Sequence, residues 1–356
     1  MRYIISVILL LSYFQINGQS SFYFFGEEVK PGTKKHFEIP ISNDNNSTTI
    51  PITVFCGIQD GKTLGITAGI HGYEYPPIIA GQKLIKSINP KSLKGVVILV
   101  QIANIASFQK RSPFVNPIDN KNLNRMFPGK KNGTISERIA NFITKEVISK
   151  SDYFLDIHGG DASEDLMSYS AYYSNSSFPN TSLEGKKMAE SLLFENIVVF
   201  DTNGKSYMKK SLPSLYCSAE AFKRGIPSVD IECGGLGKAE NKSINQIESG
   251  VLNLINHLDM TIDTSNPKFN PYYNYINERA YHKSSYNGIF YANKKAGDFV
   301  SKGMKVGNIT DYFGNIQETI NAKSDGIILI ITGTPPVNKN ETILVLGKSS
   351  SINPKK

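Results

Sequence analysis

Buried strands alternate with amphipathic helices along most of the chain. Nearly continuous apolar runs predict strands that are covered on both faces, and they lie at 64–70, 96–102, 153–157, 197–200 and 226–231. Apolar residues at helical spacing predict helices at 78–85, 135–147, 183–194, 218–224 and 244–258. This alternation of strands and helices is typical of an α/β fold, in which a central sheet is flanked by helices.

Two further stretches have a different pattern. Residues 22–58 alternate between apolar and polar positions on both sides of an Asn/Asp-rich turn, which predicts antiparallel edge strands. Residues 103–133 contain no periodic pattern and are expected to form a long irregular loop, a kind of insert that is usually functional. Thr134 and Glu137 have the spacing of a capping box, which predicts that the next helix begins there.

The pattern divides the chain into segments. We expect a catalytic domain at 19–263, a linker rich in Asn, Pro and Tyr at 264–275, and a polar tail at 349–356. Residues 276–348 contain short β-like runs separated by glycines, which predicts a smaller C-terminal all-β domain. Tyr281 and Tyr286 near its start are expected to be ordinary strand residues.

The N-terminus has the features of a secretory signal peptide. Arg2 precedes an apolar run at 3–14 that is too short to span a bilayer comfortably, and a cleavage site is expected after Gly18. Residues 1–18 are therefore expected to be removed during export to the periplasm or the extracellular space. No later stretch is long and apolar enough to predict a transmembrane helix.

Composition excludes some classes of partner and site. The chain has 356 residues, of which 40% are hydrophobic and 20% charged, with a net charge of +8. The lysines are scattered and form no basic stripe with interleaved aromatic residues, so we expect no nucleic-acid partner. The three cysteines contain no C-x-x-C pair, which argues against a thiolate zinc site.

Three of the predicted strands end in side chains that can bind a metal or move a proton. His71 and Glu74 follow the first, His158 ends the third, and Glu232 ends the strand at 226–231. Parallel strands would bring these tips to one edge of the sheet, where open α/β sheets bind ligands. Two histidines and a glutamate hold zinc with one position open for water. Considered alone, the spacing of His71 and Glu74 is also compatible with a surface histidine next to an acidic residue in the first turn of a helix.

Other residues complete a hydrolytic site. Glu232 is expected to act as general base and then as proton donor, and Asp156 is placed to orient an imidazole. The loop at 103–133 carries Arg111 and the pair Asn124-Arg125. A guanidinium there would stabilise a developing oxyanion or hold a substrate carboxylate in bidentate geometry.

Four motifs follow one another in a distinctive order. They are His71-Gly72-Tyr73-Glu74, Asn122-Leu123-Asn124-Arg125-Met126-Phe127-Pro128-Gly129, Asp156-Ile157-His158-Gly159-Gly160 and Glu232-Cys233-Gly234-Gly235. With this ordered set, the chain resembles the succinylglutamate desuccinylase/aspartoacylase family, which is related to zinc carboxypeptidases. Asn122 stands where some members carry Asp, and Asp119 is the nearby candidate for that place.

The resemblance implies an α/β fold with a central mixed sheet, similar to zinc carboxypeptidases, and a C-terminal β domain. It implies one Zn²⁺ per chain, held by the residues at positions 71, 74 and 158. It also implies that Glu232 is the catalytic acid/base, that Arg111 polarises the scissile carbonyl, and that Asn124 and Arg125 bind a substrate carboxylate.

We therefore expect a zinc-dependent hydrolase that cleaves the amide bond of a small N-acyl amino acid or peptide-like substrate outside the cytoplasm. Two alternatives remain at this stage. A carboxypeptidase or cell-wall peptide amidase would use the same carboxylate-binding pair. An exported binding protein without catalysis is the other, although the intact set of candidate catalytic residues argues against it.

Overall fold

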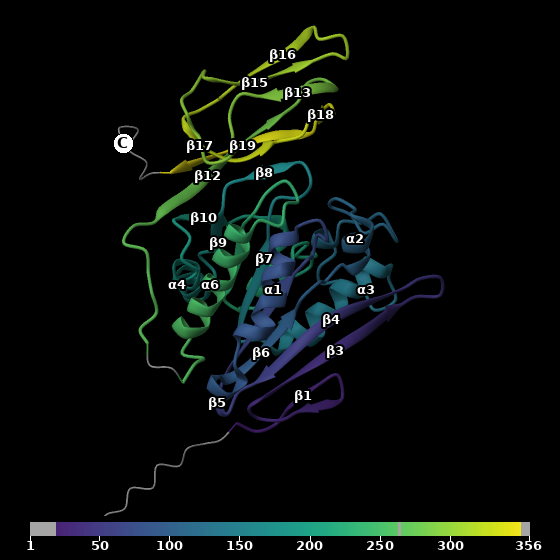
Figure 1. Ribbon diagram of the computed structural model, residues 1–356, viewed down its shortest axis with the longest axis vertical. Coiled ribbons are helices and arrows are strands. Elements are labelled where there is room, and N and C mark those ends of the chain that lie inside the picture. Colours follow the sequence, from purple (N-terminus) through teal and green to yellow (C-terminus); the bar gives the residue numbers. More distant parts are fainter. Residues whose placement is uncertain (1–18, 263–264, 350–356) are drawn as a thin grey trace, which may run out of the picture.

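Among the residues that the structure describes, a mixed sheet of 13 strands extends from the N-terminal to the C-terminal part of the chain (Figure 1). The computed structural model describes residues 19–262 and 265–349. Twelve of the strands lie in the order β14-β17-β19-β12-β10-β9-β11-β7-β5-β6-β4-β3, and β8 pairs with β17. In the first part of the chain the strands are β3 (Thr33–Ser42), β4 (Ser47–Cys56), β5 (Gln59–Ala68), β6 (Lys94–Val100), β7 (Tyr153–His158), β8 (Glu164–Leu166), β9 (Tyr169–Ser174), β10 (Asn196–Asp201) and β11 (Ser228–Glu232).

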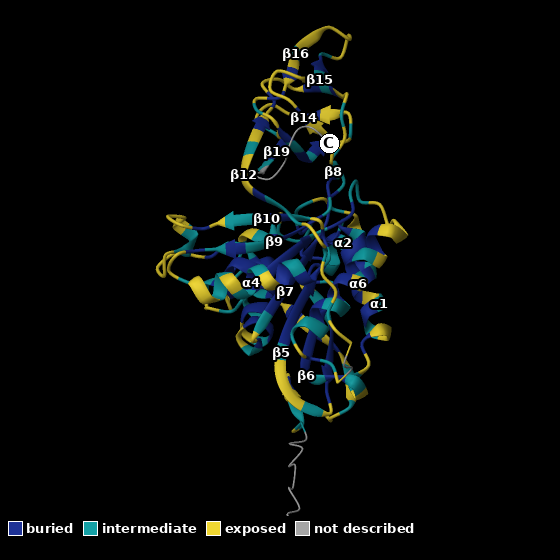
Figure 2. Ribbon diagram, turned by 90° about the vertical axis from the view of Figure 1, so that its left-hand side faces the viewer, coloured by how far each residue is buried: buried dark blue, intermediate teal, exposed yellow. Residues whose placement is uncertain are grey.

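The strands that carry the candidate site residues are direct neighbours. β11 pairs with β7, and β7 pairs with β5, both in parallel. Glu232 is in register with His158, and Ala68 with Ile157, so the three strands end at one edge of the sheet. Their apolar residues are buried because helices cover both faces (Figure 2). This arrangement confirms the predicted α/β architecture with a mixed central sheet.

Helices pack on both faces of this sheet. They are α1 (Tyr75–Ser87), α2 (Ile105–Lys110), α3 (Ile135–Phe142), α4 (Pro179–Ser191), α5 (Cys217–Lys223) and α6 (Asn241–His257). Buried residues of α1, α4 and α6 share one hydrophobic core with the sheet, and those of α3 and α5 share another. The predicted capping box is present at the start of α3.

Some elements differ from the sequence predictions. The segment 103–133 is not wholly irregular, because it contains α2 and a short 3₁₀ turn at Leu123–Arg125. β9 was not predicted, since its residues Tyr169–Ser174 lack a continuous apolar run. β9 runs antiparallel to β11 and parallel to β10, which is why the sheet is mixed at this point. The helix predicted at 135–147 leaves α geometry after Phe142 and continues as a π turn.

The C-terminal strands continue the central sheet. β12 (Asn274–Lys283) pairs in parallel with β10 and antiparallel with β19 (Thr342–Ser349). The others are β13 (Gly288–Ala292), β14 (Phe299–Val300), β15 (Lys305–Thr310), β16 (Ile316–Asn321), β17 (Gly326–Thr332) and β18 (Pro336–Val337). A second sheet, in the order β16-β15-β13-β18, packs on this end of the molecule through its own core. The predicted all-β character of the C-terminal part is confirmed, and the domain boundaries stay predictions.

The remaining elements lie near the N-terminal end of the described chain. β1 (Phe22–Phe24) and β2 (Glu27–Val29) form a separate two-stranded sheet. The expected signal peptide at 1–18 lies outside the described residues, as does the expected tail apart from residue 349. Within the described part of the chain, no helix has both the length and the apolar character that a membrane crossing requires.

Candidate active site

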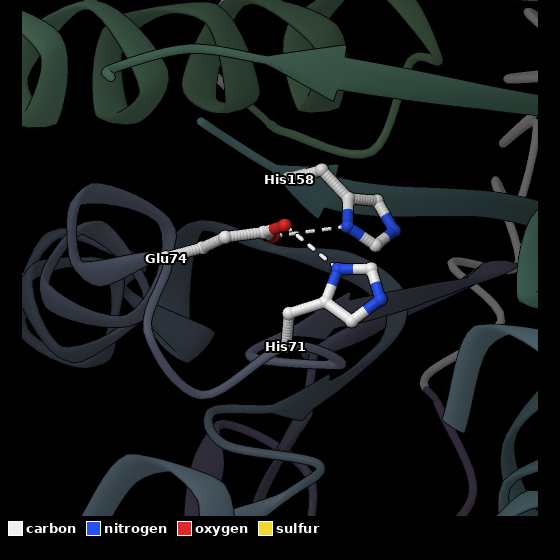
Figure 3. Close-up of side chains that lie close together, drawn as sticks. All are labelled: His71, Glu74 and His158. Carbon is white, nitrogen blue, oxygen red and sulfur yellow. Dashed lines mark hydrogen bonds and ion pairs between the residues drawn. The ribbon is translucent and has the colours of Figure 1, made fainter. Parts of the chain in front are cut away.

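Two imidazoles converge on one carboxylate at the edge where β5 and β7 end (Figure 3). His71 Nδ1 lies 2.7 Å from Glu74 Oε1, and His158 Nδ1 lies 3.0 Å from Glu74 Oε2. One candidate ligand atom from each residue lies within 4.8 Å of the other two, and all three side chains are buried. The structure thus brings together the three residues that the sequence predicts to hold a metal.

A tight turn after β5 positions His71 and Glu74. A Cβ atom on Gly72 would lie 2.1 Å from the backbone nitrogen of Phe108, so only glycine allows this turn to pack against α2. Glu74 is the N-cap residue of α1, and prolines occupy the first turn of that helix. Proline suits this position because it lacks only an N–H that the helix would leave unpaired. A tightly packed turn therefore fixes the positions of the His71 imidazole and the Glu74 carboxylate.

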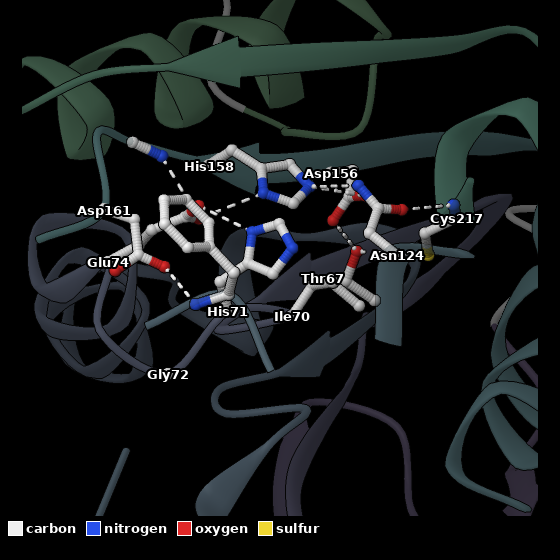
Figure 4. A network of polar contacts seen from close by, with 12 residues as sticks. Thr67, Ile70, His71, Gly72, Glu74, Asn124, Asp156, His158, Asp161 and Cys217 are labelled. Atoms are coloured by element: carbon white, nitrogen blue, oxygen red, sulfur yellow. Dashed lines mark hydrogen bonds and ion pairs between the residues drawn. The ribbon is translucent and has the colours of Figure 1, made fainter. Parts of the chain in front are cut away.

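The second nitrogen of each imidazole, Nε2, forms a hydrogen bond with an oxygen acceptor. His71 Nε2 donates to Asn122 Oδ1 at 3.0 Å, and His158 Nε2 donates to Asp156 Oδ2 at 3.0 Å. Thr67 in turn donates its hydroxyl to Asp156 Oδ1 at 2.5 Å (Figure 4). With the proton fixed on Nε2, each histidine directs Nδ1 toward Glu74, which is how histidine is prepared to ligate a metal.

Asn122 itself, and not Asp119, occupies the place beside the metal-binding residues. The carboxylate of Asp119 accepts hydrogen bonds from the backbone N–H and the hydroxyl of Ser136, each at 2.8 Å. Asp119 therefore braces the start of α3. The expectation that it would replace the Asp of other family members is wrong, because the amide oxygen of Asn122 already supplies the acceptor.

Electrostatic interactions couple the protonation of the three residues in the cluster. Burial opposes charge on every member, but the two histidines outweigh this effect and lower the pKa of Glu74 to about 2. Glu74 likewise raises the pKa of His71 against the effect of burial. Asp156 and Glu74 raise that of His158 well above its usual value. The carboxylate and the two imidazoles thus stabilise one another's charged forms, and a cation bound between them would take the place of a proton on each imidazole.

This donor set fits zinc. Two imidazole nitrogens and a carboxylate are ligands that zinc accepts in hydrolytic sites, where a fourth position stays open. The hydrogen bonds from both Nε2 atoms supply the outer contacts that such ligands normally have. His71, Glu74 and His158 would therefore hold the ion.

Glu232 lines the same cavity as the three ligand residues. It is in register with His158 on the neighbouring strand. Burial raises the pKa of Glu232 well above its usual value, and the nearby carboxylates of Glu74 and Glu164 add to this increase. A divalent cation in the cluster would act in the opposite direction and favour the carboxylate form. Glu232 can therefore both take up and release a proton.

Asn124 and Arg125 also line the cavity. Asn124 Oδ1 accepts a hydrogen bond from the backbone N–H of Cys217 at 2.9 Å, and its Nδ2 lies 3.4 Å from His158 Nε2. The guanidinium of Arg125 stacks 4.7 Å from the centroid of the Tyr216 ring. Arg125 forms no ion pair with any described acidic residue, so its charge remains available to a ligand.

Arg111 occupies a different place. It ends α2 in the left-handed conformation, with φ of 50°, and its side chain is exposed. It is absent from the described residues that line the cavity. The structure therefore does not bring Arg111 together with the other candidate residues, and its role at the scissile carbonyl stays a prediction.

The C-terminal strands contribute part of the cavity wall. The cavity has a volume of about 450 Å³, and Arg279 and Tyr281 of β12 and Ile330 of β17 line it. The interpretation of Tyr281 as an ordinary strand residue is thus incomplete, whereas Tyr286 lies in the turn after β12 and outside the lining. Alternation along β12 places residues 279 and 281 on one face, but nothing in the sequence shows which face meets the cavity.

Glu164 is a further cavity residue that the sequence did not reveal. It lies on β8, directly after the His158 motif, and accepts a hydrogen bond from the backbone N–H of Asp161 at 3.0 Å. Burial raises the pKa of Glu164 to about 7. The only signal in the sequence was its position six residues after His158.

Comparison with known proteins identifies the family. The model of the succinylglutamate desuccinylase/aspartoacylase catalytic domain matches residues 60–258. The chain belongs to the succinylglutamate desuccinylase/aspartoacylase family. The expectation of an enzyme of the deacylase or hydrolase type is confirmed at this level, and the matched range contains all the candidate site residues.

Individual relatives extend the match beyond this range. The chain is 27% identical over 320 residues to the N-alpha-acetyl-L-2,4-diaminobutyric acid deacetylase of Halomonas elongata, covering 87% of this chain and 90% of that protein. The crystal structure of a succinylglutamate desuccinylase/aspartoacylase from Rhodobacter sphaeroides has a TM-score of 0.78 at 23% identity, covering 89% of this chain and 96% of that one. The product-bound ectoine utilization protein EutE (DoeB) of Ruegeria pomeroyi has a TM-score of 0.77 at 22% identity, with coverage of 88% and 95%. These two structures share the fold of this chain.

Proposed function

We propose that the protein is a zinc-dependent deacylase that hydrolyses the amide bond of an N-acyl amino acid. One observation carries the proposal: His71 and His158 direct their Nδ1 atoms onto the two carboxylate oxygens of Glu74, beside the buried carboxyl group of Glu232. This is the donor set and the base of a hydrolytic zinc site. The relative that deacetylates N-alpha-acetyl-L-2,4-diaminobutyric acid supports an acetylated amino acid as substrate.

The residues of this chain have distinct roles in the proposed reaction. Bound zinc would supply Lewis acidity, which polarises the amide carbonyl and makes a water molecule more acidic. Glu232 takes a proton from the attacking water and returns it to the nitrogen of the leaving amino acid. The acceptors Asn122 and Asp156 keep the two imidazoles in the ligating tautomer.

Recognition of the substrate carboxylate is assigned to Asn124 and Arg125. The guanidinium of Arg125 is suited to bidentate binding, and its stacking on Tyr216 limits its freedom before the substrate arrives. The hydrogen bond from Cys217 fixes the amide of Asn124 with Nδ2 free to donate. Holding the carboxylate here would place the amide bond of a short substrate near the metal-binding residues.

A substrate panel with metal analysis tests the proposal. We expect about one zinc ion per chain in the purified protein and none in His158→Ala. The zinc-loaded protein should release amino acids from N-acetyl amino acids, and it should cleave dipeptides with free C-termini far more slowly. Faster cleavage of the peptides would favour the carboxypeptidase alternative. Stable binding of these ligands without turnover would favour the binding-protein alternative.

The proposal includes export, since residues 1–18 have the pattern of a signal peptide. Fractionation of cells that produce the full chain, with N-terminal sequencing of the mature protein, tests this part. A protein that begins at Gln19 in the exported fraction is the expected result. Full-length protein in the cytoplasm would contradict export without affecting the catalytic proposal.

A further inference from the structure

Phe114 has a backbone conformation that an aromatic residue seldom adopts. Its φ is 57°, in the left-handed region, where the Cβ atom of a bulky side chain crowds the backbone. Its side chain lines the cavity that contains the candidate metal ligands, and its ring meets the ring of His71 edge-on, with 6.4 Å between the two centroids. A strained residue at a candidate active site indicates a function, since such strain persists only where neighbouring groups fix the backbone.

The carboxylate of Asp161 fixes the backbone of Phe114. Asp161 is fully buried, and its Oδ2 atom accepts a hydrogen bond of 2.8 Å from the backbone N–H of Phe114. Its Oδ1 atom accepts a hydrogen bond of 2.6 Å from the backbone N–H of Ala162. Hydrogen bonds to a charged acceptor are among the stronger ones in proteins. Asp161 therefore ties the loop at 103–133 to the turn that follows His158.

The same turn connects Phe114 with apolar side chains of β8 and β17. The backbone N–H of Glu164 donates to the carbonyl oxygen of Asp161 at 2.8 Å, so β8 begins where this turn ends. Two residues further along β8, Leu166 is in register with Ile330 of β17, and both side chains line the cavity. Glu164 lines it too, with its carboxylate held by the backbone N–H of Asp161 at 3.0 Å. Phe114, Leu166 and Ile330 thus form an apolar end of the cavity.

The residues assigned to the substrate carboxylate lie on the other side of the metal-binding residues. Figure 4 shows Asp161 on the same side of the two imidazoles as Glu74, and Asn124 on the opposite side. Nδ2 of Asn124 lies 3.4 Å from His158 Nε2, whereas Glu74 contacts Nδ1 of the same ring. The amide bond has to reach the metal to be cleaved. A substrate whose carboxylate is held beside Asn124 therefore directs its acyl group toward Phe114.

We propose that Phe114 closes the apolar end of the cavity and limits the length of the acyl group that the protein removes, and that Asp161 is the positioning residue that holds it there. This inference rests on the proposed deacylase function and names the residue that determines one part of its specificity. The phenyl ring offers apolar contact to a short acyl chain. A longer chain collides with it, because the backbone of Phe114 cannot shift without losing the hydrogen bond to Asp161.

A series of acyl lengths on the zinc-loaded protein tests the role of Phe114. The substrates are the N-acetyl, N-butyryl and N-hexanoyl derivatives of the amino acid that is released fastest in the substrate panel. In the wild type we expect kcat/KM for the hexanoyl substrate to be about 10- to 100-fold below that for the acetyl substrate, the range for forcing extra methylenes into a packed site. Phe114→Ala should reduce this ratio by about tenfold or more, and Phe114→Leu should improve cleavage of the butyryl substrate more than that of the hexanoyl one. A wild type that prefers hexanoyl, or an unchanged ratio in Phe114→Ala, would overturn the proposal.

The variant Asp161→Asn tests the positioning role. Asparagine has the same shape but only one oxygen, so it can accept only one of the two backbone N–H groups. We expect the acetyl-to-hexanoyl ratio of kcat/KM to fall by about 3- to 10-fold, and to change no further when Asp161→Asn is added to Phe114→Ala. Asp119→Asn is the matched control and should leave the ratio unchanged, since Asp119 also accepts two hydrogen bonds, from Ser136, but lies outside the cavity lining. An equal loss of activity on all acyl lengths in Asp161→Asn would show that Asp161 only stabilises the fold.

Binding without turnover separates this inference from the proposed function. Calorimetry on zinc-loaded Glu232→Gln compares the N-acetyl and N-hexanoyl derivatives of one amino acid, with and without Phe114→Ala. Tighter binding of the acetyl derivative by about tenfold or more, lost in the double variant, supports the inference even if the wild type hydrolyses no amide. Equal binding of both derivatives, in a protein whose wild type does hydrolyse N-acetyl amino acids, would retain the deacylase proposal and reject the role of Phe114. Binding of neither derivative would reject both.

Discussion

Asn122 accepts a hydrogen bond of 3.0 Å from His71, although 51 residues separate them in the sequence. The contact joins the loop at 103–133 to the turn after β5. The same Asn122 oxygen accepts the backbone N–H of Asn124 at 2.9 Å, so one side chain supports a proposed metal ligand and a proposed substrate-binding residue together. Changes at position 122 should therefore affect zinc affinity and substrate affinity at once.

Replacement of Asn122 by Ala should weaken zinc binding by about 10- to 100-fold, because the imidazole of His71 loses the acceptor that fixes its tautomer. Competition with a chromogenic chelator measures the affinity. Asn122→Asp keeps an acceptor at this place and should retain most of it. If the alanine variant binds zinc as tightly as the wild type, the hydrogen bond has no part in preparing the ligand.

Replacement of Glu232 by Gln should lower kcat by about 100- to 10,000-fold while zinc content and KM stay close to those of the wild type, since the amide cannot move the proton. Steady-state kinetics with an N-acetyl amino acid and metal analysis of the same sample check this. Full turnover in the variant would assign the general base to another group, and Glu164 would be the first candidate because its pKa of about 7 also suits proton transfer.

Glu137 should make the stability of α3 depend on pH in the acid range. The backbone N–H of Thr134 donates to its carboxylate, and Lys130 and Lys121 lie beside it, which together lower its pKa to about 2. The pKa in the unfolded chain is about 4.3, so the stabilisation is complete above that pH and disappears as the pH falls toward 2.

Glu137→Gln should therefore be less stable than the wild type by about 1 kcal/mol at pH 7, the usual contribution of a capping interaction. Urea unfolding at several pH values measures the difference, which should shrink below pH 4 and vanish near pH 2. A difference that stays constant down to that pH would show that the charge of Glu137 contributes nothing.

The catalytic part and the C-terminal strands should unfold together. β12 pairs with β10 on one side and β19 on the other, and one hydrophobic core contains Tyr169, Val198, Ile276 and Val345 from both parts. Calorimetry should show a single transition, and a chain that ends after residue 263 should expose the edge of β10 and aggregate. Two separate transitions would mean that the shared strand does not couple the two parts.

The sequence correctly predicted the strands and helices that are determined by a local pattern of residues. The apolar runs at 64–70 and 153–157 located β5 and β7, and their tips carry His71 and His158 as expected. Thr134 and Glu137 correctly marked the start of α3. In these cases strand burial or helix capping depends on residues close together in the chain, so the residues themselves reveal the element.

Long-range pairing could not be predicted in the same way. β9 is a strand because it fills the space between β10 and β11, not because its residues Tyr169–Ser174 carry an apolar run. Asp230 lies within the predicted strand at 226–231, and nothing in the sequence indicates that it pairs in register with Asp156 and accepts a hydrogen bond from the Tyr173 hydroxyl. Arg111 lies at the exposed end of α2, and its role at the scissile carbonyl stays a prediction.

The pairing of β8 with β17 has an evolutionary consequence. Glu164 of β8 lies in register with Thr332 of β17, so the segment that follows His158 borders directly on the C-terminal strands. Substitutions in β12 or β17 can reshape the cavity while the metal-binding residues and the proton donor stay as they are. New substrate preferences can thus arise in this protein by mutation of a region that takes no part in bond cleavage.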